Sequence, residues 1–352
     1  MKFSPYSVPT AVRHDVVALG ECMVRLSPPG PGRIEFTRSL EVDVGGGEYN
    51  VAYACARLGL KTAFLSKLPK NALASLILNH ARAVGMDVDH VAMEAHDGVG
   101  RRNRVGLYFA EIGTGVRGGM ALFDRGHSSA SAMRPEDVNW SKLFEKEGVR
   151  WLHTGGIFAV LSESTRATLR VAFDAARAAG TSVSYDLNFR AALAGSAEAA
   201  AINREFVGRS EMLIGSADGF RALLGQNTPA GSVQTLVEAV AAAFPNLRWI
   251  AGTERTTLSG DRHDLSGFVW EMGEWFDGRI YRDLEIVDRV GTGDAFAAGL
   301  IRGILIGTGL QAALDFGLAH AALVHTTRGD TSQFSVAEIE AVAGGAGAAM
   351  QR

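Results

Sequence analysis

The residues best suited to chemistry form the segment 288–294, with the sequence DRVGTGD. A strand-like run ends near Val287 and an apolar helix begins near Asp294, so Gly291 and Gly293 leave unobstructed backbone N–H groups where the helix starts. A helix N-terminus carries unpaired donors and a partial positive charge, which suit a phosphate or a developing oxyanion. A carboxylate at the same point can accept the proton of an attacking hydroxyl while the amides hold a transferring phosphoryl group. The alternative interpretation is a glycine turn whose aspartate caps the helix.

A second glycine cluster, GGGEYN at residues 45–50, leads directly into a helical pattern. Consecutive glycines let a ligand approach the main chain, and the Asn50 amide offers a donor and an acceptor to a hydroxyl. The alternative is a flexible turn with Asn50 as the helix N-cap. The sequence has no Gly-Lys-Ser/Thr triplet, and Phe296 stands where a dinucleotide-binding loop needs its third glycine, which disfavours a Walker A loop and a nicotinamide dehydrogenase. The spacing of the histidines and cysteines predicts no metal site.

The elements that must position these loops alternate between short apolar runs and amphipathic segments. The order predicts a mostly parallel sheet covered by helices on both faces. The predicted strands are Val16–Leu19, Thr62–Leu65, Trp151–His153, Val183–Tyr185, Met212–Ile214 and Trp249–Ala251. The predicted helices are Val51–Leu58, Ala72–Val84, Thr165–Ala179, Val233–Phe244 and Leu310–Val324.

Two stretches interrupt this alternation. In residues 33–44 the apolar side chains recur at even spacing, which predicts a half-exposed strand. Residues 104–125 contain two strand-like runs, Val105–Ala110 and Met120–Phe123, joined by a glycine-rich segment. Both stretches are consistent with β-structure that forms a lid over the carboxyl ends of the strands, where open α/β sheets bind ligands. Two ordinary surface hairpins are the alternative.

Composition limits the class of protein. The chain has 352 residues, 47% of them hydrophobic and 21% charged, with a formal net charge of −3, so it is neither disordered nor basic enough for a nucleic-acid partner. Two cysteines make no disulfide framework and favour a reducing compartment. We find no secretory signal and no apolar run of membrane-spanning length, so we expect a cytoplasmic protein without a membrane partner.

The two glycine motifs, in this order and spacing, resemble those of the ribokinase-like (PfkB) carbohydrate kinases over nearly the whole chain. Within that family the sequence is most similar to the 2-keto-3-deoxygluconate kinases. The resemblance implies one three-layer α/β/α domain spanning residues 1–352, with a mostly parallel sheet and a small β lid formed by residues 33–44 and 104–125. It is carried by five further segments: Leu26–Pro29, Leu107–Tyr108, Phe123–Ser131, Asp186–Arg190 and Arg328–Asp330.

The resemblance also implies roles for individual residues. The catalytic base falls on Asp294 and the anion hole on Gly291, Thr292 and Gly293. Substrate contacts fall on Gly46, Gly47, Asn50, Tyr108, Phe123, Arg125, Arg190 and Asp330. ATP contacts fall on Asn188, Arg190, Gly252, Thr253, Gly291, Thr292, Gly293 and Asp294. The implied reaction is transfer of a phosphoryl group from ATP to the terminal hydroxyl of 2-keto-3-deoxygluconate, with Mg²⁺ as the cation and with no metal ligand assigned.

A physical argument supports an acid substrate. A sugar acid carries a carboxylate, which the planar guanidinium of Arg125 or Arg190 can bind through both oxygens. Two features depart from the family: residues 216–219 read Ser-Ala-Asp-Gly where an Asn-x-x-Glu motif is usual, and Phe123 replaces a tyrosine of some relatives. The alternatives are a fructokinase or another neutral-sugar kinase, and a catalytically silent regulator that binds sugar or nucleotide. We also expect a homo-oligomer formed through the lid.

Overall fold

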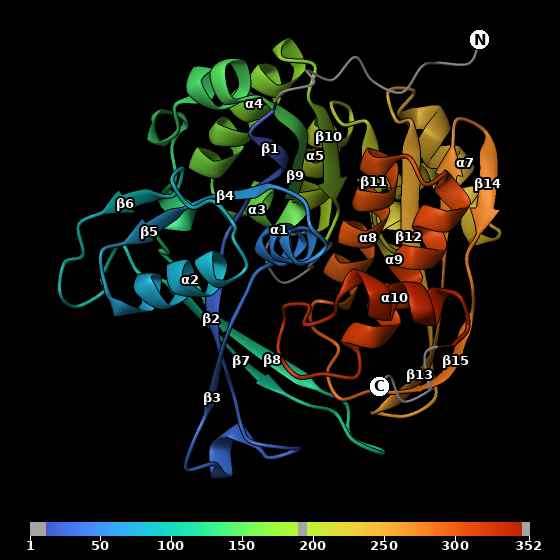
Figure 1. Cartoon of the computed structure of the whole chain (residues 1–352), viewed down its shortest axis with the longest axis horizontal. Helices are drawn as coiled ribbons and strands as arrows, with labels where there is room; N and C mark the ends of the chain where they lie inside the picture. The colour runs from blue at the N-terminus through green and yellow to red at the C-terminus, as the bar shows by residue number, and fades with distance from the viewer. Residues whose placement is uncertain (1–11, 189–195, 347–352) are drawn as a thin grey trace.

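The computed structural model describes residues 12–188 and 196–346 (Figure 1). The described chain forms a nine-stranded central sheet in the order β14-β13-β12-β11-β10-β9-β1-β4, with β15 also paired with β13. The six strands from β4 to β12 run parallel, and the hairpin strands beyond β12 are antiparallel. The strands of this sheet are β1 (His14–Leu19), β4 (Thr62–Leu65), β9 (Val149–Gly155), β10 (Ser182–Asp186), β11 (Met212–Ile214), β12 (Trp249–Thr257), β13 (Arg262–Glu271), β14 (Glu274–Asp277) and β15 (Tyr281–Glu285).

Helices cover both faces of the sheet. Successive residues of a strand point to opposite sides, and here the residues on both sides are apolar, so each face has to be buried. Val16 and Trp151 pack in the core beneath α1, α8 and α9, whereas their neighbours Val17 and Leu152 pack in the core beneath α4, α5 and α7. The sheet and the helices on its two faces form the three layers seen in Figure 1, with one core on each side of the sheet. The helices are α1 (Gly47–Arg57), α2 (Ala72–Ala83), α3 (Gly156–Leu161), α4 (Glu163–Ala178), α5 (Ser196–Val207), α6 (Ala217–Leu224), α7 (Val233–Ala243), α8 (Thr292–Ile306), α9 (Leu310–Val324) and α10 (Val336–Ala343).

The predicted strands and helices of the central domain are confirmed, with differences at their ends. The predictions Thr62–Leu65, Met212–Ile214 and Leu310–Val324 coincide with β4, β11 and α9. Helix α1 begins at Gly47, four residues before its predicted start. Two of the three glycines are therefore part of the helix start: Gly46 is the N-cap and Gly47 is the first helical residue. The long hairpin of β12 and β13 was not predicted beyond Ala251.

A smaller sheet lies at the carboxyl end of the parallel strands, in the lower part of Figure 1. Its order is β3-β2-β7-β8, with β2 at Met23–Ser27, β3 at Glu41–Gly45, β7 at Gly106–Glu111 and β8 at Met120–Asp124. A separate two-stranded sheet pairs β5 (Lys67–Pro69) with β6 (Ala92–Glu94). The predicted strand over residues 33–44 is wrong in its first half, where residues 34–36 form a 3₁₀ turn. Glu41 pairs with Ser27, the last residue of β2, so the preceding residues have no strand opposite them.

No helix among the described residues is long and apolar enough to cross a membrane.

Candidate active site

Asp294 lies in the first turn of α8 and is held by a residue 244 positions away in the sequence. The Asn50 side-chain amide donates to Asp294 Oδ2 at 2.7 Å, and Asn50 Oδ1 accepts from the Gly46 N–H at 3.2 Å. Burial, followed by the neighbouring charges of Asp186 and Asp330, raises the pKa of Asp294 well above its usual value despite the Asn50 hydrogen bond. Asn50 thus orients a carboxylate that is unusually basic, and both ends of its amide are already engaged.

The glycine loop before α8 has the conformation that an anion-binding helix start requires. Gly291 is the N-cap residue with φ of 80°, and a Cβ at this position would collide with the backbone carbonyl of Asp330. Gly293 faces open space, whereas the Thr292 hydroxyl donates to the Arg289 carbonyl at 3.1 Å. The N–H groups of the first turn therefore remain available next to Asp294.

Asn188 brings the end of β10 to the same place. A Cβ built on Gly47 would lie 3.1 Å from Asn188 Nδ2 and 3.8 Å from Asp294 Oδ1, so the three residues are neighbours. Asn188 has φ of 40°, and its N–H donates to Asp186 Oδ1 at 2.8 Å. Arg190, predicted to contact both substrates, lies outside the described residues.

Gly252 and Thr253, predicted to contact ATP, follow the last residue of β12 that pairs with β11. This position is the carboxyl end of the parallel part of the sheet. A Cβ on Gly252 would collide with the Gly215 carbonyl at the end of β11.

A buried arginine joins the small sheet to the loop before α8. Arg25 of β2 donates from Nη1 to Asp330 Oδ1 at 2.8 Å, pairs through Nη2 with Asp288 Oδ2 at 2.6 Å, and donates from Nε to Ser27 at 2.8 Å. The Tyr108 hydroxyl donates to the other oxygen of Asp330. We call these five residues the Arg25 cluster. Burial opposes ionisation of Asp330 more than Arg25 and Tyr108 favour it, and raises its pKa to about 6.

A second buried arginine lies on the small sheet, next to the end of β1. Arg125 pairs with Glu21, and Glu48 lies against Gly20 at the start of α1. Three atoms of this group have no hydrogen-bond partner among the described residues: Arg125 Nε, Glu21 Oε1 and Glu48 Oε1. Burial raises the pKa of Glu48 to about 7. We call Arg125, Glu21 and Glu48 the Arg125 cluster, and only its arginine was singled out from the sequence.

Comparison with known proteins identifies the family. The model of the pfkB family carbohydrate kinases matches residues 13–250 and 278–337. The chain belongs to this family. It is 31% identical to a 2-dehydro-3-deoxygalactonokinase of Haloferax volcanii over 96% of this chain and 99% of the relative. It is 26% identical to a 5-dehydro-2-deoxygluconokinase of Shouchella clausii over 88% of this chain and 89% of the relative. A solved 2-dehydro-3-deoxygluconokinase of Thermotoga maritima is 35% identical over 95% of this chain and 99% of that chain, with a TM-score of 0.87.

Two positions set this PfkB chain apart from the pattern expected of its family. Ser216 caps α6 by accepting from the Gly219 N–H at 3.2 Å, and Asp218 points into solvent, where it pairs with Arg221 at 2.9 Å. Asp218 is 87% exposed, so it does not replace the missing glutamate in this structure. Phe123 is half-exposed and stacks on the Tyr108 ring with 5.6 Å between centroids.

Proposed function

We propose that this PfkB kinase transfers the γ-phosphoryl group of ATP to the terminal hydroxyl of 2-keto-3-deoxygluconate, giving the 6-phosphate and ADP. The observation that carries the proposal is the placement of Asp294 beside the free N–H groups of α8. A carboxylate and an anion hole at one point are what proton removal and phosphoryl transfer require. The names of the relatives support a keto-deoxy sugar acid, and one of them makes 5-dehydro-2-deoxygluconate the second candidate.

In the proposed reaction Asp294 accepts the proton of the attacking hydroxyl as its oxygen bonds to the γ-phosphorus. The raised pKa makes its carboxylate a stronger base, and the Asn50 amide keeps one oxygen fixed while the other faces the substrate. The N–H groups following Gly291 stabilise the negative charge of the transferring group. Closure of the small sheet excludes water and thus limits ATP hydrolysis.

The Arg125 cluster supplies the proposed recognition of the acid group. Arg125 Nε is buried without an acceptor among the described residues, so a substrate carboxylate can accept its hydrogen bond. Arg190 and the Tyr108–Asp330 pair complete the proposed contacts, with Gly46 and Gly47 against the sugar hydroxyls. Asn188, Gly252 and Thr253 are the proposed contacts to ATP.

The oxygen donors at this edge of the sheet fit a magnesium ion. Asp186 and Glu48 are buried carboxylates, and Glu48 Oε1 has no partner within residues 12–188 and 196–346. Mg²⁺ prefers such oxygens together with substrate phosphates. We propose that these two residues hold the cation in place of the missing Asn-x-x-Glu glutamate. When bound, the ion neutralises phosphate charge during transfer.

The decisive experiment is an ADP-release assay with ATP and Mg²⁺. The sugars tested are 2-keto-3-deoxygluconate, its galactose-series epimer, 5-keto-2-deoxygluconate, gluconate, fructose and ribose. We expect turnover with keto-deoxy acids. In Asp294→Asn the rate should fall by a factor on the order of 10²–10⁴, whereas Asp218→Asn, a change of an exposed acid, leaves the rate unchanged. Preference for fructose or ribose would overturn the substrate, and near-normal turnover by Asp294→Asn would overturn its role. ATP binding without turnover of any sugar would indicate a regulator.

We also propose that the chain acts in the cytoplasm, where ATP is available, and that it pairs through the outer side of the small sheet. Apolar side chains are exposed there, namely Val42, Met120 and Leu122. Large apolar patches of this kind mark interfaces. We expect sedimentation velocity to show a dimer that Leu122→Glu shifts to monomer, while a monomeric wild type would refute the pairing.

A further inference from the structure

A group of histidine and acidic side chains lies at the amino end of the parallel strands, at the opposite end of β1 from the kinase site. His14 is the first residue of β1 and pairs with Val149, the first residue of β9. Gly20 and Glu21, which border the kinase site, follow the other end of β1. The proposed phosphoryl transfer uses none of these histidine and acidic residues, so their arrangement needs a separate explanation.

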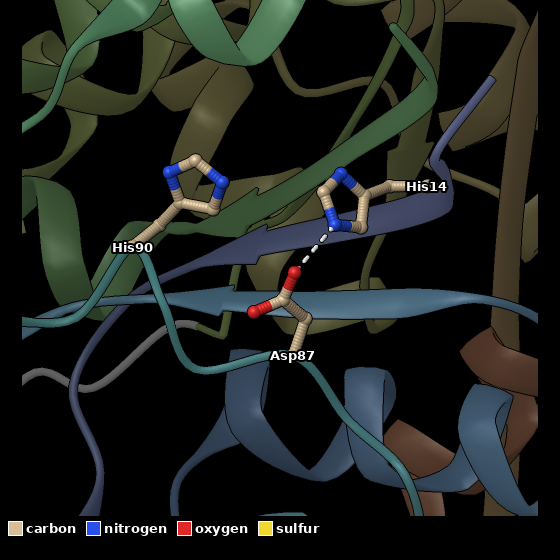
Figure 2. A group of neighbouring side chains, drawn as sticks. All are labelled: His14, Asp87 and His90. Atoms are coloured by element: carbon tan, nitrogen blue, oxygen red, sulfur yellow. Dashed lines mark hydrogen bonds and ion pairs between the residues drawn. The ribbon is translucent and has the colours of Figure 1, made fainter. Parts of the chain in front are cut away.

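The arrangement resembles a set of metal ligands. His14 Nε2 lies 3.0 Å from Asp87 Oδ2, and one ligand atom each from His14, Asp87 and His90 lies within 4.8 Å of the other two. Figure 2 shows the three side chains gathered from different segments of the chain, with a nitrogen of the His14 ring pointing at the Asp87 carboxylate. His90 Nε2 also lies 2.8 Å from Glu147 Oε2, which places a further carboxylate next to this ring. Both histidines are at most 9% exposed.

The backbone holds these residues in place without any metal. The Asp89 N–H donates to Asp87 Oδ1 at 2.8 Å, while Oδ2 faces His14 and also accepts from Arg13 Nη2 at 2.7 Å. Asp87 is itself joined to β4 by two backbone hydrogen bonds, to Thr62 at 2.9 Å and from Phe64 at 3.0 Å. The Arg13 N–H donates to the Glu147 carbonyl at 2.8 Å, which ties the start of β1 to the turn before β9. Such preorganisation lowers the cost of binding an ion.

The charges of the group do not balance. Three carboxylates, those of Asp87, Asp89 and Glu147, meet two cationic side chains, those of Arg13 and Lys142. With both imidazoles neutral the group keeps one negative charge. Arg13 is 44% exposed, so its side chain can move toward water when another cation arrives.

We propose that His14, Asp87 and His90, with Glu147 as a fourth ligand, bind a divalent transition metal of the zinc type. Imidazole nitrogens with carboxylate oxygens select Zn²⁺ and Co²⁺ over Mg²⁺, which takes oxygen donors. Ligand atoms in a tetrahedral zinc site are about 3.4 Å apart, given bonds of about 2.0–2.1 Å, and the hydrogen-bonded pairs here are already close to that spacing. The ion would fasten β1, the loop after α2 and the turn before β9 to one another.

The test uses untagged full-length protein freed of metal with a chelator and kept in excess Mg²⁺, which occupies oxygen sites at the kinase end. Co²⁺ is the probe, because four-coordinate Co²⁺ has strong visible absorption. We expect one Co²⁺ per chain, displaced by Zn²⁺. His14→Gln and His90→Gln should each weaken binding by about 100-fold or more, while His96→Gln, a change outside the group, leaves it unaltered.

Binding of less than one Co²⁺ per chain overturns the proposal. So does Co²⁺ binding that is unchanged in both His14→Gln and His90→Gln. Circular dichroism checks the fold of each variant. His90 lies in a turn outside the strands, so its variant decides the question if His14→Gln unfolds. ADP release by His90→Gln should equal that of the wild type. The two readouts are therefore independent: the metal-site proposal can fail while the proposed kinase function holds, and the kinase function can fail while the metal site holds.

Discussion

Two buried arginines lie on the small sheet near the kinase site, and they differ in how completely their hydrogen bonds are satisfied. Arg25 has a partner for each of its three nitrogens, in Ser27, Asp330 and Asp288. Arg125 is paired with Glu21 through Nη2, and its Nε has no acceptor in the described segments. Both side chains are at most 9% exposed, so water does not complete the shell of Arg125.

The difference is consistent with the proposed roles, in which the Arg25 cluster supports the fold and Arg125 recognises the substrate. A buried ion pair with a full set of hydrogen bonds fixes geometry, and the Arg25 cluster fixes the loop that carries Gly291 and Asp294. A buried polar atom without a partner is costly and is retained where a ligand completes it. The Arg125 cluster has three such atoms within the described part of the chain.

The largest expected effect comes from breaking the satisfied cluster. Arg25→Met leaves Asp288 and Asp330 buried without their cation, so we expect the free energy of unfolding to fall by about 3–5 kcal/mol. Urea unfolding followed by fluorescence measures this, with Arg33→Met, a change of a half-exposed arginine, as the control. A loss below about 1 kcal/mol would show that the cluster contributes as little as a surface pair.

The local parts of this arrangement were predictable, and the long-range parts were not. The periodicity of apolar residues in a strand or a helix can be recognised within about ten residues. Strands such as β4 and helices such as α9 were therefore predictable from the sequence. Arg25 lies 305 residues from Asp330, and an arginine in the short run Met23–Ser27 gives no local sign of that partner. The small sheet was anticipated in part, but β2, which joins its halves, was missed.

Glu21 and Glu48 were missed for a different reason. An acidic residue in the first turn of a helix is ordinary, because it interacts favourably with the helix dipole. Only the folded structure, in which Gly20 and the end of β9 approach Glu48 closely, shows that Glu48 is buried and that its Oε1 has no partner among the described residues. The proposed metal ligands were missed for a similar reason, since the fold and not the sequence spacing brings His14 and His90 together.

The second prediction sharpens the comparison through pH. Glu48 has a pKa of about 7 in the folded protein and an ordinary pKa of 4.5 in the unfolded chain, so the folded protein binds more protons between these values. The free energy of unfolding should therefore fall as the pH rises from 4.5 to 7, by an amount on the order of 3 kcal/mol. Glu48→Gln removes this contribution, whereas Glu41→Gln, a change of an exposed acid, keeps it. Urea unfolding at several pH values measures both, and equal slopes in the wild type and Glu48→Gln would contradict the buried, unsatisfied state.

The smallest expected effect is the most specific one, because it depends on the substrate. Arg125→Ala removes a charge-assisted contact worth about 1.5–3 kcal/mol, so kcat/KM for a keto-deoxy acid should fall by about 10–100-fold. A neutral sugar has no carboxylate at this point, so any residual turnover of fructose should change far less. Arg104→Ala, a change of an arginine that lies just before β7 and pairs with Asp124, serves as the matched control. An equal loss for acid and neutral substrates would mean that Arg125 supports the fold as Arg25 does, and the unsatisfied Nε would then have no role in recognition.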